Sequence, residues 1–526
     1  MKKQTLSTDD IAVLILFSAI IFGTWLRIMP VWMAGFPIND GGMFYTMIQD
    51  LQANHYTLPL LTTYNQLSIP YVYPPLGFYI GAAITNLLKL SSPLSVVQWL
   101  PGILNAFCIP AFYMLAKEIS ANKLQSAVST LVFAFIPHLT AWFSMGGGLT
   151  RSLGAFFMLL AITNIHRVFA NNSNKDIWGA IIFSSLGALS HTEAPIYTIA
   201  IAVYVWAMKS HSIEGIKKGL LISMGVLICT SPWLIWINNN HGLAPLISAG
   251  QTSFRSIWSI LKLLNIDLLT EEPYLDILGA IGILGMAFLV TRKNFFLPGM
   301  IVVIFLSHPR SAHTIGNIPL AMAAGYFVTD VLLPSITSSQ VNPANRNKIK
   351  QYTLPIFFAI LIPYVISNSL YYEITLSQKH VSESDKNAMA WVEENTAKES
   401  KFLVITGETN GLCDSTSEWF PALAKRQSLG TLQGNEWLKG KEFTQFAGNI
   451  QTVQACSGVG FDCIMMQSKP FAKDFDYLYV SLSSPTVNCE LTNASTVPRS
   501  LVHDIKDSST LQVVFSSDDV VIFGPK

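Results

Sequence analysis

Long apolar segments fill most of the first 372 residues, and they limit how this part of the chain can fold. A helix crosses a bilayer with roughly 20 mostly apolar residues, because its backbone must satisfy its own hydrogen bonds there. Eleven segments of the sequence approach this requirement. They are residues 11–29, 95–115, 125–143, 152–169, 177–190, 194–208, 219–237, 274–290, 295–307, 315–333 and 351–371. The pattern predicts a polytopic α-helical membrane protein with about eleven transmembrane helices.

The charged residues divide the chain in two. Residues 373–526 hold 13 basic and 19 acidic residues, whereas residues 1–372 hold 20 basic and 13 acidic ones. Such a change is typical of a domain boundary. We therefore expect a transmembrane domain over residues 1–372 and a soluble α/β domain over residues 373–526. The overall net charge of +1 argues against nucleic acid as a partner.

The C-terminal part has the pattern of mixed helices and strands. Residues 383–394 suit a helix, with Ser382 or Ser384 as its N-cap. Three further segments are rich in Val, Ile, Phe, Tyr and Leu, as strands are. They are residues 401–406, 477–482 and 511–523.

The basic residues indicate the orientation in the membrane. Residues 73–90 are also apolar, and the orientation depends on whether they cross. If they lie at the surface, 14 of the 20 basic residues before position 373 fall on the same side as the N-terminus, which is the cytoplasmic side by the positive-inside rule. We therefore predict a multi-pass plasma-membrane protein with a cytoplasmic N-terminus. Residues 33–93 would form the first external loop, and the C-terminal domain would be extracytoplasmic.

The cysteines agree with this orientation. Cys108 and Cys229 lie in predicted spans and suit small apolar core positions. The other four lie in the C-terminal part, where an external domain could use them for two disulfides with three possible pairings. They are Cys413, Cys456, Cys463 and Cys489. A zinc site is the weaker interpretation, because no pair has the short knuckle spacing.

Asp40 is the most conspicuous acidic residue near the predicted outer surface. It follows the first span in the sequence Pro-Ile-Asn-Asp-Gly-Gly, and helical spacing begins at Met43. A carboxylate at a helix start can serve as an N-cap. The same position also suits a general base, so both interpretations stay open.

Three predicted outer turns carry further ionisable residues. Residues 144–151 place three glycines before Arg151, and glycine lets the backbone approach a ligand closely. A flexible turn with a snorkelling arginine is the alternative interpretation. His191 and Glu193 lie in a second turn, where a capped turn is an equally good interpretation. Ionisable residues are densest in the third turn, which holds His308, Arg310 and His313. Arg310 is the first choice for a phosphate contact, because a guanidinium binds phosphate bidentately.

A long loop follows the seventh span. Residues 238–273 are partly apolar and hold Arg255 and Lys262. A loop of this length is often a lid or a binding element, although a plain packing helix explains it equally well. Arg255 is thus a further candidate for donor-phosphate binding, together with Arg151.

These features resemble the C-type (GT-C) membrane glycosyltransferases. The resemblance lies in the order of the motifs: a span, Asp40, a long outer loop with Tyr73-Pro74-Pro75-Leu76, many spans and an external α/β domain. The superfamily includes protein O-mannosyltransferases, aminoarabinose transferases of lipid A and the oligosaccharyltransferase catalytic subunit. The resemblance implies that Asp40 is the catalytic or metal-linked carboxylate.

Two departures from the family pattern bear on a metal. The family commonly has a second acidic residue beside the first-loop Asp, where this chain has Gly41, and oligosaccharyltransferases have acidic residues in the second outer loop, where this chain has glycines. These departures argue against that branch and its divalent-metal site. No cofactor is certain. A divalent metal stays open if His191, Glu193, His308 and His313 converge.

The resemblance also implies a reaction. A sugar on a polyprenyl phosphate would move, with inversion, to an acceptor hydroxyl on the outer face of the membrane, with Asp40 accepting the proton and arginines holding the phosphate. Membrane lipids and a glycan, lipid or protein acceptor are the implied partners in the cell envelope. Two other classes stay open: a transporter or flippase of lipid-linked glycans, and a non-catalytic glycan-binding membrane protein.

Overall fold

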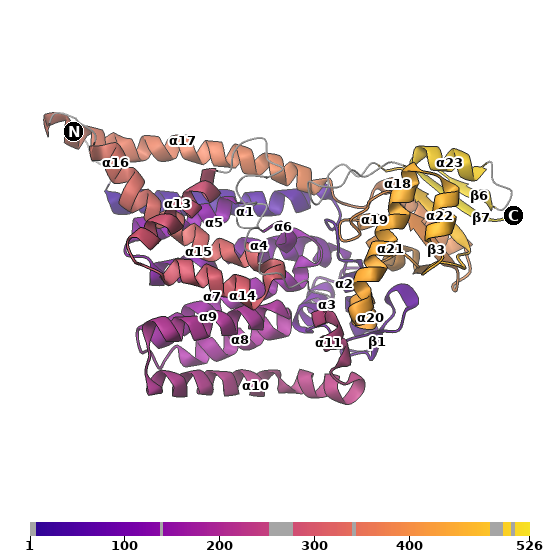
Figure 1. Cartoon of the computed structure of the whole chain (residues 1–526), viewed down its shortest axis with the longest axis horizontal. Coiled ribbons are helices and arrows are strands. Elements are labelled where there is room, and N and C mark those ends of the chain that lie inside the picture. The colour runs from indigo at the N-terminus through magenta and orange to yellow at the C-terminus, as the bar shows by residue number, and fades with distance from the viewer. Residues whose placement is uncertain (1–6, 137–139, 252–276, 339–342, 484–497, 507–510) are drawn as a thin grey trace.

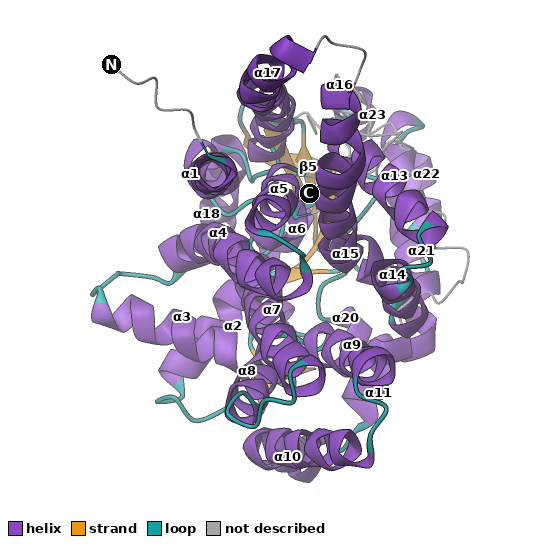
Figure 2. Ribbon diagram, turned by 90° about the vertical axis from the view of Figure 1, so that its left-hand side faces the viewer, coloured by secondary structure: helices purple, strands orange, loops and turns teal. Residues whose placement is uncertain are grey.

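The computed structural model describes residues 7–136, 140–251, 277–338, 343–483, 498–506 and 511–526, and the following statements concern these residues. A bundle of long helices forms one end of the molecule, and a smaller α/β part caps the other end (Figure 1). Figure 2 looks along the bundle from its far end, with the strands of the α/β part behind the helices. This arrangement agrees with a membrane part followed by a C-terminal α/β part.

Helices lie in all eleven segments that the sequence predicts as spans, although the main helix in residues 125–143 ends at Phe135. They are α1 (Thr8–Ala34), α4 (Leu94–Ile119), α5 (Lys123–Phe135), α7 (Gly148–Ala170), α8 (Ile177–Ser190), α9 (Glu193–Lys209), α10 (Ile213–His241), α13 (Ile277–Thr291), α14 (Phe296–Ser307), α15 (Ala312–Phe327) and α17 (Pro343–Ser377). Within the described residues, six helices are long and apolar enough to cross a membrane. A seventh crossing is possible if α13 and α14, which meet at a bend of 116°, form one broken span. Eleven crossings and the orientation of the termini therefore stay predictions.

Close packing of small residues and one buried cation hold the first helices together. Gly23 of α1 lies so near Ala134 that an added Cβ would be 2.8 Å from the alanine Cβ. Arg27 of α1 is buried. Its guanidinium donates to the main-chain oxygens of Asn105 at 2.6 Å and Phe133 at 2.9 Å. Arg27 thus links α1 to α4 and α5, which gives this intramembrane charge a structural explanation.

The first external loop folds into short elements. They are α2 (Gly42–Ala53), β1 (Leu61–Thr62), β2 (Ile69–Pro70) and α3 (Leu76–Leu87). α3 occupies most of the apolar segment 73–90, and its 12 residues are shorter than a span requires. The short length of α3 agrees with the prediction that this segment does not cross.

The α/β part contains a five-stranded mixed sheet in the order β4-β3-β5-β7-β6. Its elements are α18 (Glu383–Asn395), β3 (Lys401–Ile405), α19 (Ser415–Ala424), β4 (Gln427–Ser428), α20 (Asn435–Lys439), α21 (Phe443–Ala455), α22 (Phe461–Gln467), β5 (Tyr477–Ser481), α23 (Arg499–Lys506), β6 (Leu511–Ser516) and β7 (Val520–Pro525). β3 pairs in parallel with β4 and β5, whereas β7 is antiparallel to β5 and β6. Ser382 caps α18, as predicted. The single strand predicted over residues 511–523 is instead the β6–β7 hairpin.

Disulfides form in the C-terminal part, as the sequence suggests. Cys456 and Cys463 form a disulfide, and Cys413 is also disulfide-bonded. Cys489 lies outside the described residues. Cys108 and Cys229 are free, and Cys108 is buried as predicted. Cys229 is exposed, so its prediction as a core residue is wrong.

The two parts of the chain share one apolar core. Trp419 of α19 is fully buried, and its ring centroid lies 4.8 Å from that of Phe36, which follows α1. Phe420 is also fully buried. The aromatic residues of α19 therefore pack in a core, and this packing fixes the α/β part against the start of the first external loop.

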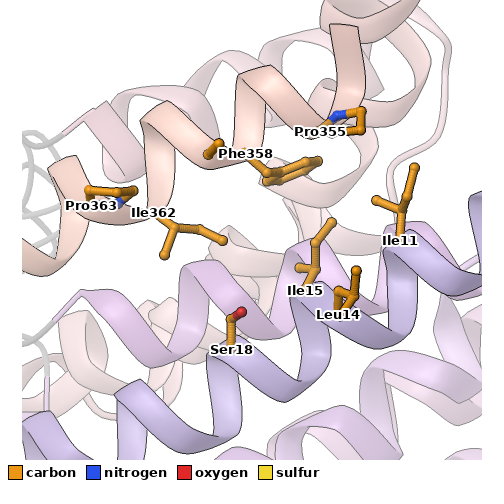
Figure 3. Close-up of a pocket in the computed structure, with 9 residues that line it drawn as sticks. Ile11, Leu14, Ile15, Ser18, Pro355, Phe358, Ile362 and Pro363 are labelled. Carbon is orange, nitrogen blue, oxygen red and sulfur yellow. The ribbon is translucent and has the colours of Figure 1, made fainter. Parts of the chain in front are cut away.

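An apolar pocket lies between α1 and α17. Ile11, Ile15 and Ser18 of α1 face Phe358 and Ile362 of α17 across it (Figure 3). These α1 residues lie in the N-terminal half of the helix, whereas Asp40 follows its C-terminus, which is about 24–35 Å from them at 1.5 Å per helical residue. The pocket is therefore separate from the polar groups described below.

Candidate functional site

Asp40 lies at the junction of the bundle and the α/β part, in the short segment between α1 and α2. α1 ends at Gly35, which has a left-handed backbone conformation. The Asp40 side chain is mostly buried. Its Oδ1 accepts a hydrogen bond from the Gly147 N–H at 2.8 Å, and its Oδ2 lies 3.0 Å from Nη1 of Arg151. Arg151, predicted as a phosphate ligand, therefore forms an ion pair with Asp40.

The three glycines before Arg151 allow this approach. The Gly146 N–H donates to the Ile38 main-chain oxygen at 2.9 Å, so the glycine segment runs beside residues 38–40. An added Cβ at Gly146 would overlap the main-chain oxygen of Asp40, and one at Gly147 would overlap its carboxylate. Glycine is thus required here because another chain segment occupies the space of a side chain.

Asp40 does not cap the helix that follows it. The N-cap residue of α2 is Gly41, which has no side chain to serve as a cap. Glu418 of α19 supplies the missing acceptors: its Oε2 binds the Gly42 N–H at 3.0 Å and its Oε1 binds the Met43 N–H at 3.2 Å. The N-cap interpretation of Asp40 is therefore wrong.

Glu418 lies in an unusual environment for a carboxyl group. Its side chain is buried. Burial, and after it the nearby charge of Asp40, raise the pKa of Glu418 to about 8, while the backbone N–H groups of α2 oppose this shift. One feature of the sequence indicates that such a group is needed, because a helix that begins at Gly41-Gly42 lacks a local side-chain cap.

A second polar cluster joins two of the predicted outer turns. Glu193, at the start of α9, accepts a hydrogen bond from the Ser311 hydroxyl at 3.0 Å, and its Oε1 lies 3.2 Å from Nε2 of His308. The Tyr197 hydroxyl donates to the His308 main-chain oxygen at 2.6 Å. The structure therefore brings Glu193 and His308 together, and it adds Ser311 and Tyr197, which the sequence analysis did not single out.

Tyr73 connects the two clusters. Its ring centroid lies 6.1 Å from that of His191 and 5.7 Å from that of Trp437, and its hydroxyl accepts a hydrogen bond from Thr150 at 3.3 Å. Burial raises the pKa of Tyr73 to about 12. The charge of Arg151 acts on Asp40, Tyr73 and Glu193, so these groups share one region.

Arg310 lies on a short turn, η3 (Pro309–Ser311), between α14 and α15. Its side chain is exposed, and no hydrogen bond or ion pair to the described residues holds its guanidinium. Glu436 of α20 is close enough to interact electrostatically with both Arg310 and Arg151. Burial raises the pKa of Glu436. Arg310 is therefore an available cation beside the region that Tyr73 borders.

Two further residues, His313 and Arg255, are predicted as site residues. His313 is half-buried in the first turn of α15. Arg255 lies outside the described residues, as does most of the predicted lid. α11 (Ala244–Gln251), the described helix within residues 238–273, packs against α20.

The candidate metal ligands among the described residues do not form a cluster. The part of the chain that the structure describes contains no group of three or more His, Cys, Asp or Glu side chains arranged to hold a metal ion. His191, Glu193, His308 and His313 therefore do not converge on a metal site.

Comparisons with known proteins identify the fold. Residues 72–236 match the family model described as dolichyl-phosphate-mannose-protein mannosyltransferase. No curated protein sequence matches the chain significantly. Two solved structures superpose on nearly the whole chain. The archaeal oligosaccharyltransferase AglB from Archaeoglobus fulgidus, solved with an inhibitory peptide and a dolichol-phosphate, has a TM-score of 0.53 and 14% identity over 90% of this chain and 69% of its own. ArnT from Cupriavidus metallidurans has a TM-score of 0.54 and 11% identity over 97% of each chain.

A third similar structure is the arabinofuranosyltransferase AftD from Mycobacteria, with a TM-score of 0.52 and 12% identity over 100% of this chain and 42% of its own. All three structures and the family model represent GT-C glycosyltransferases. The resemblance to this superfamily that the sequence predicted is therefore confirmed, and the fold is that of a GT-C membrane protein.

Proposed function

We propose that this protein, whose fold is that of the GT-C glycosyltransferases, moves a sugar from a polyprenyl-phosphate donor to an acceptor hydroxyl on the outer face of the membrane. The single observation that carries the proposal is the placement of Asp40. Its carboxylate is held by the Gly147 N–H and Arg151, where the helical bundle meets the α/β part. A carboxylate fixed in this way can orient a hydroxyl and accept its proton.

In the proposed reaction the acceptor oxygen attacks the anomeric carbon of the donor sugar. The bond from that carbon to the phosphate oxygen breaks, the hydroxyl proton passes to Asp40, and polyprenyl phosphate leaves. A single displacement inverts the anomeric centre. A carboxylate has lone pairs beyond the two that Gly147 and Arg151 use, so Asp40 can still accept this proton.

Arg310 is the proposed ligand of the donor phosphate. It is exposed, and no ion pair with the described residues occupies it. A guanidinium can bind phosphate and stabilise the negative charge that develops on it as a leaving group. Arg151 has a different proposed role from the one predicted, because its contact with Oδ2 of Asp40 suits it to orient that carboxylate.

The test uses purified protein in nanodiscs with a panel of polyprenyl-phosphate sugars and cell-envelope extracts as acceptors. Release of polyprenyl phosphate is measured for the wild type, for Asp40→Asn and for Asp50→Asn. Asp50 is a matched control, because it lies on α2 and binds Thr62 and Thr63 instead of the site. The proposal expects release by the wild type and by Asp50→Asn, and its loss in Asp40→Asn with folding unchanged.

Two results would count against the proposal. Equal release by the wild type and Asp40→Asn would remove Asp40 from its role. Absence of release with every donor and acceptor would favour the transport or non-catalytic alternatives.

A further inference from the structure

Glu418 and Trp419 of the α/β part form four hydrogen bonds with the first external loop and the residue before Asp40, besides the aromatic packing. Glu418 binds the N–H groups of Gly42 and Met43 through its carboxyl oxygens. Its main-chain oxygen accepts from the Tyr64 hydroxyl at 2.6 Å. The next residue, Trp419, donates its indole N–H to the Asn39 main-chain oxygen at 3.1 Å. These bonds join residues that lie more than 350 positions apart in the sequence.

The start of α2 depends on Glu418 for its hydrogen bonding. The first N–H groups of a helix have no partner within the helix and need an outside acceptor, because burial without one is costly. Gly41 and Gly42 have no side chains, and the Asp40 carboxylate faces Gly147 and Arg151. The buried Glu418 carboxyl group is thus the acceptor that completes this helix terminus.

Gly41 transmits this contact to Asp40. Its φ is +128°, a conformation that favours glycine. An added Cβ would lie 3.0 Å from the Gly146 Cα and 3.2 Å from Cζ2 of Trp419. The backbone at Gly41 is therefore confined between the glycine segment of the bundle and α19 of the α/β part. A shift of α19 would move Gly41, and with it the neighbouring Asp40.

We propose that Glu418 is a positioning residue, through which the α/β part holds the α2 terminus so that the Asp40 carboxylate stays bonded to Gly147 and Arg151. The expected effect of Glu418 on catalysis rests on the proposed function. Its expected effect on the position of the Asp40 carboxylate does not depend on that function. Under this proposal the α/β part is a working component of the site, and no contact of Glu418 with substrate is needed.

Hydrogen exchange tests, without any substrate, whether Glu418 holds the Asp40 carboxylate in place. The Gly147 N–H donates to Asp40 Oδ1, so its exchange rate reports where that carboxylate lies. In full-length protein in nanodiscs, Glu418→Ala is expected to speed exchange about tenfold at the N–H groups of Gly42 and Met43, and also at Gly147. Glu418→Gln keeps the size of the side chain and is expected to give a smaller change at the same places, which covers the case in which the alanine variant folds poorly.

Asp385→Asn is the matched control. Asp385 is another buried carboxyl group of the α/β part, but its partners, Tyr479 and Ser483, lie in that part. Its replacement is expected to leave exchange at Gly42 and Gly147 unchanged. Faster exchange at Gly42 and Met43 in Glu418→Ala, with Gly147 unchanged, would overturn the proposal. An equal change at Gly147 in Asp385→Asn would overturn it too, because the effect would then be general destabilisation.

Turnover measurements test whether this positioning by Glu418 matters for catalysis. Glu418→Ala is expected to lower kcat about tenfold to 100-fold with little change in KM for the donor, because a displaced carboxylate affects the reaction more than donor binding. Unchanged kcat together with faster Gly147 exchange would overturn the positioning role. A wild type without turnover, but with the expected exchange pattern, would overturn the proposed function while supporting the geometric inference.

Discussion

The guanidinium of Arg151 and the carboxylate of Asp40 form an ion pair at 3.0 Å, between residues that the sequence separates by 111 positions. The pair is mostly shielded from solvent, since the two side chains are 28% and 11% exposed. Arg151 also lies over the ring of Trp142, 5.1 Å from its centroid. The arginine is therefore held in place from two sides, and it fixes the direction of the Asp40 carboxylate.

Replacement of Arg151 by Ala is expected to lower kcat by about 100-fold, because Asp40 loses the partner of its Oδ2 and can turn away from the acceptor. Release of polyprenyl phosphate measures the effect. Arg167→Ala is the control, since Arg167 lies at the other end of the same helix and pairs with Glu118. Equal losses in the two variants would contradict a specific role for Arg151.

Gly147→Ala is expected to reduce turnover by a similar factor of about 100. The added methyl group would overlap the Asp40 carboxylate and lie 2.9 Å from Nη1 of Arg151. Gly219→Ala serves as the comparison, because its methyl group would meet only Phe169, at 3.7 Å. Turnover is measured for both variants alongside thermal unfolding, and unimpaired turnover in Gly147→Ala would show that the close approach is not needed.

Arg310→Gln is expected to raise KM for the donor about tenfold to 100-fold, because it removes one charge-assisted hydrogen bond to the phosphate. Such a bond is worth about 1.5–3 kcal/mol. The free energy of unfolding should change little, because the side chain is exposed. Arg292→Gln is a suitable control, since Arg292 is an exposed arginine in the turn between α13 and α14. A KM for Arg310→Gln equal to that of the wild type would remove Arg310 from the phosphate site.

The stability of the α/β part is expected to fall as the pH rises from about 5 to above 8. Burial raises the pKa of Glu418 to about 8 and that of Asp414 to about 7. At a pH between the usual pKa of these carboxyl groups and their raised pKa, the folded protein binds more protons than the unfolded chain. The free energy of unfolding therefore decreases as the pH rises. Thermal unfolding across this range measures the effect. Glu418→Gln should show a weaker pH dependence, and an identical dependence would contradict the assignment to Glu418.

Local patterns in the sequence predicted most of the elements. The segments 177–190 and 295–307 match α8 and α14 closely, because apolar residues of helical length are a local signal. The segment 511–523 contains two strands where one was predicted. β6 ends at Ser516 and β7 begins at Val520. The residues on both sides of this turn are apolar, so the segment resembles one continuous strand.

The candidate site was predicted only in part. Asp40, Glu193 and His308 were singled out because ionisable residues at membrane depth are costly, and the structure places them in one region with Tyr73. Arg151 was expected to bind phosphate, but it pairs with Asp40. Trp419 and Phe420 pack in the core, whereas the neighbouring Glu418 carboxyl group accepts hydrogen bonds from Gly42 and Met43.

The sequence by itself determined the apolar helices, the mixed α/β part and the order of motifs that resembles the GT-C superfamily, because each of these depends on neighbouring residues along the chain. The tertiary structure alone decided that Asp40 turns toward Arg151 and that Glu418 caps α2. These contacts join residues 111 and 376 positions apart. A carboxylate that precedes a helix can cap that helix or bind groups elsewhere. Here the packing of α19 against α2 brings the Glu418 carboxyl group to the helix terminus, so the Asp40 carboxylate binds Gly147 and Arg151 instead.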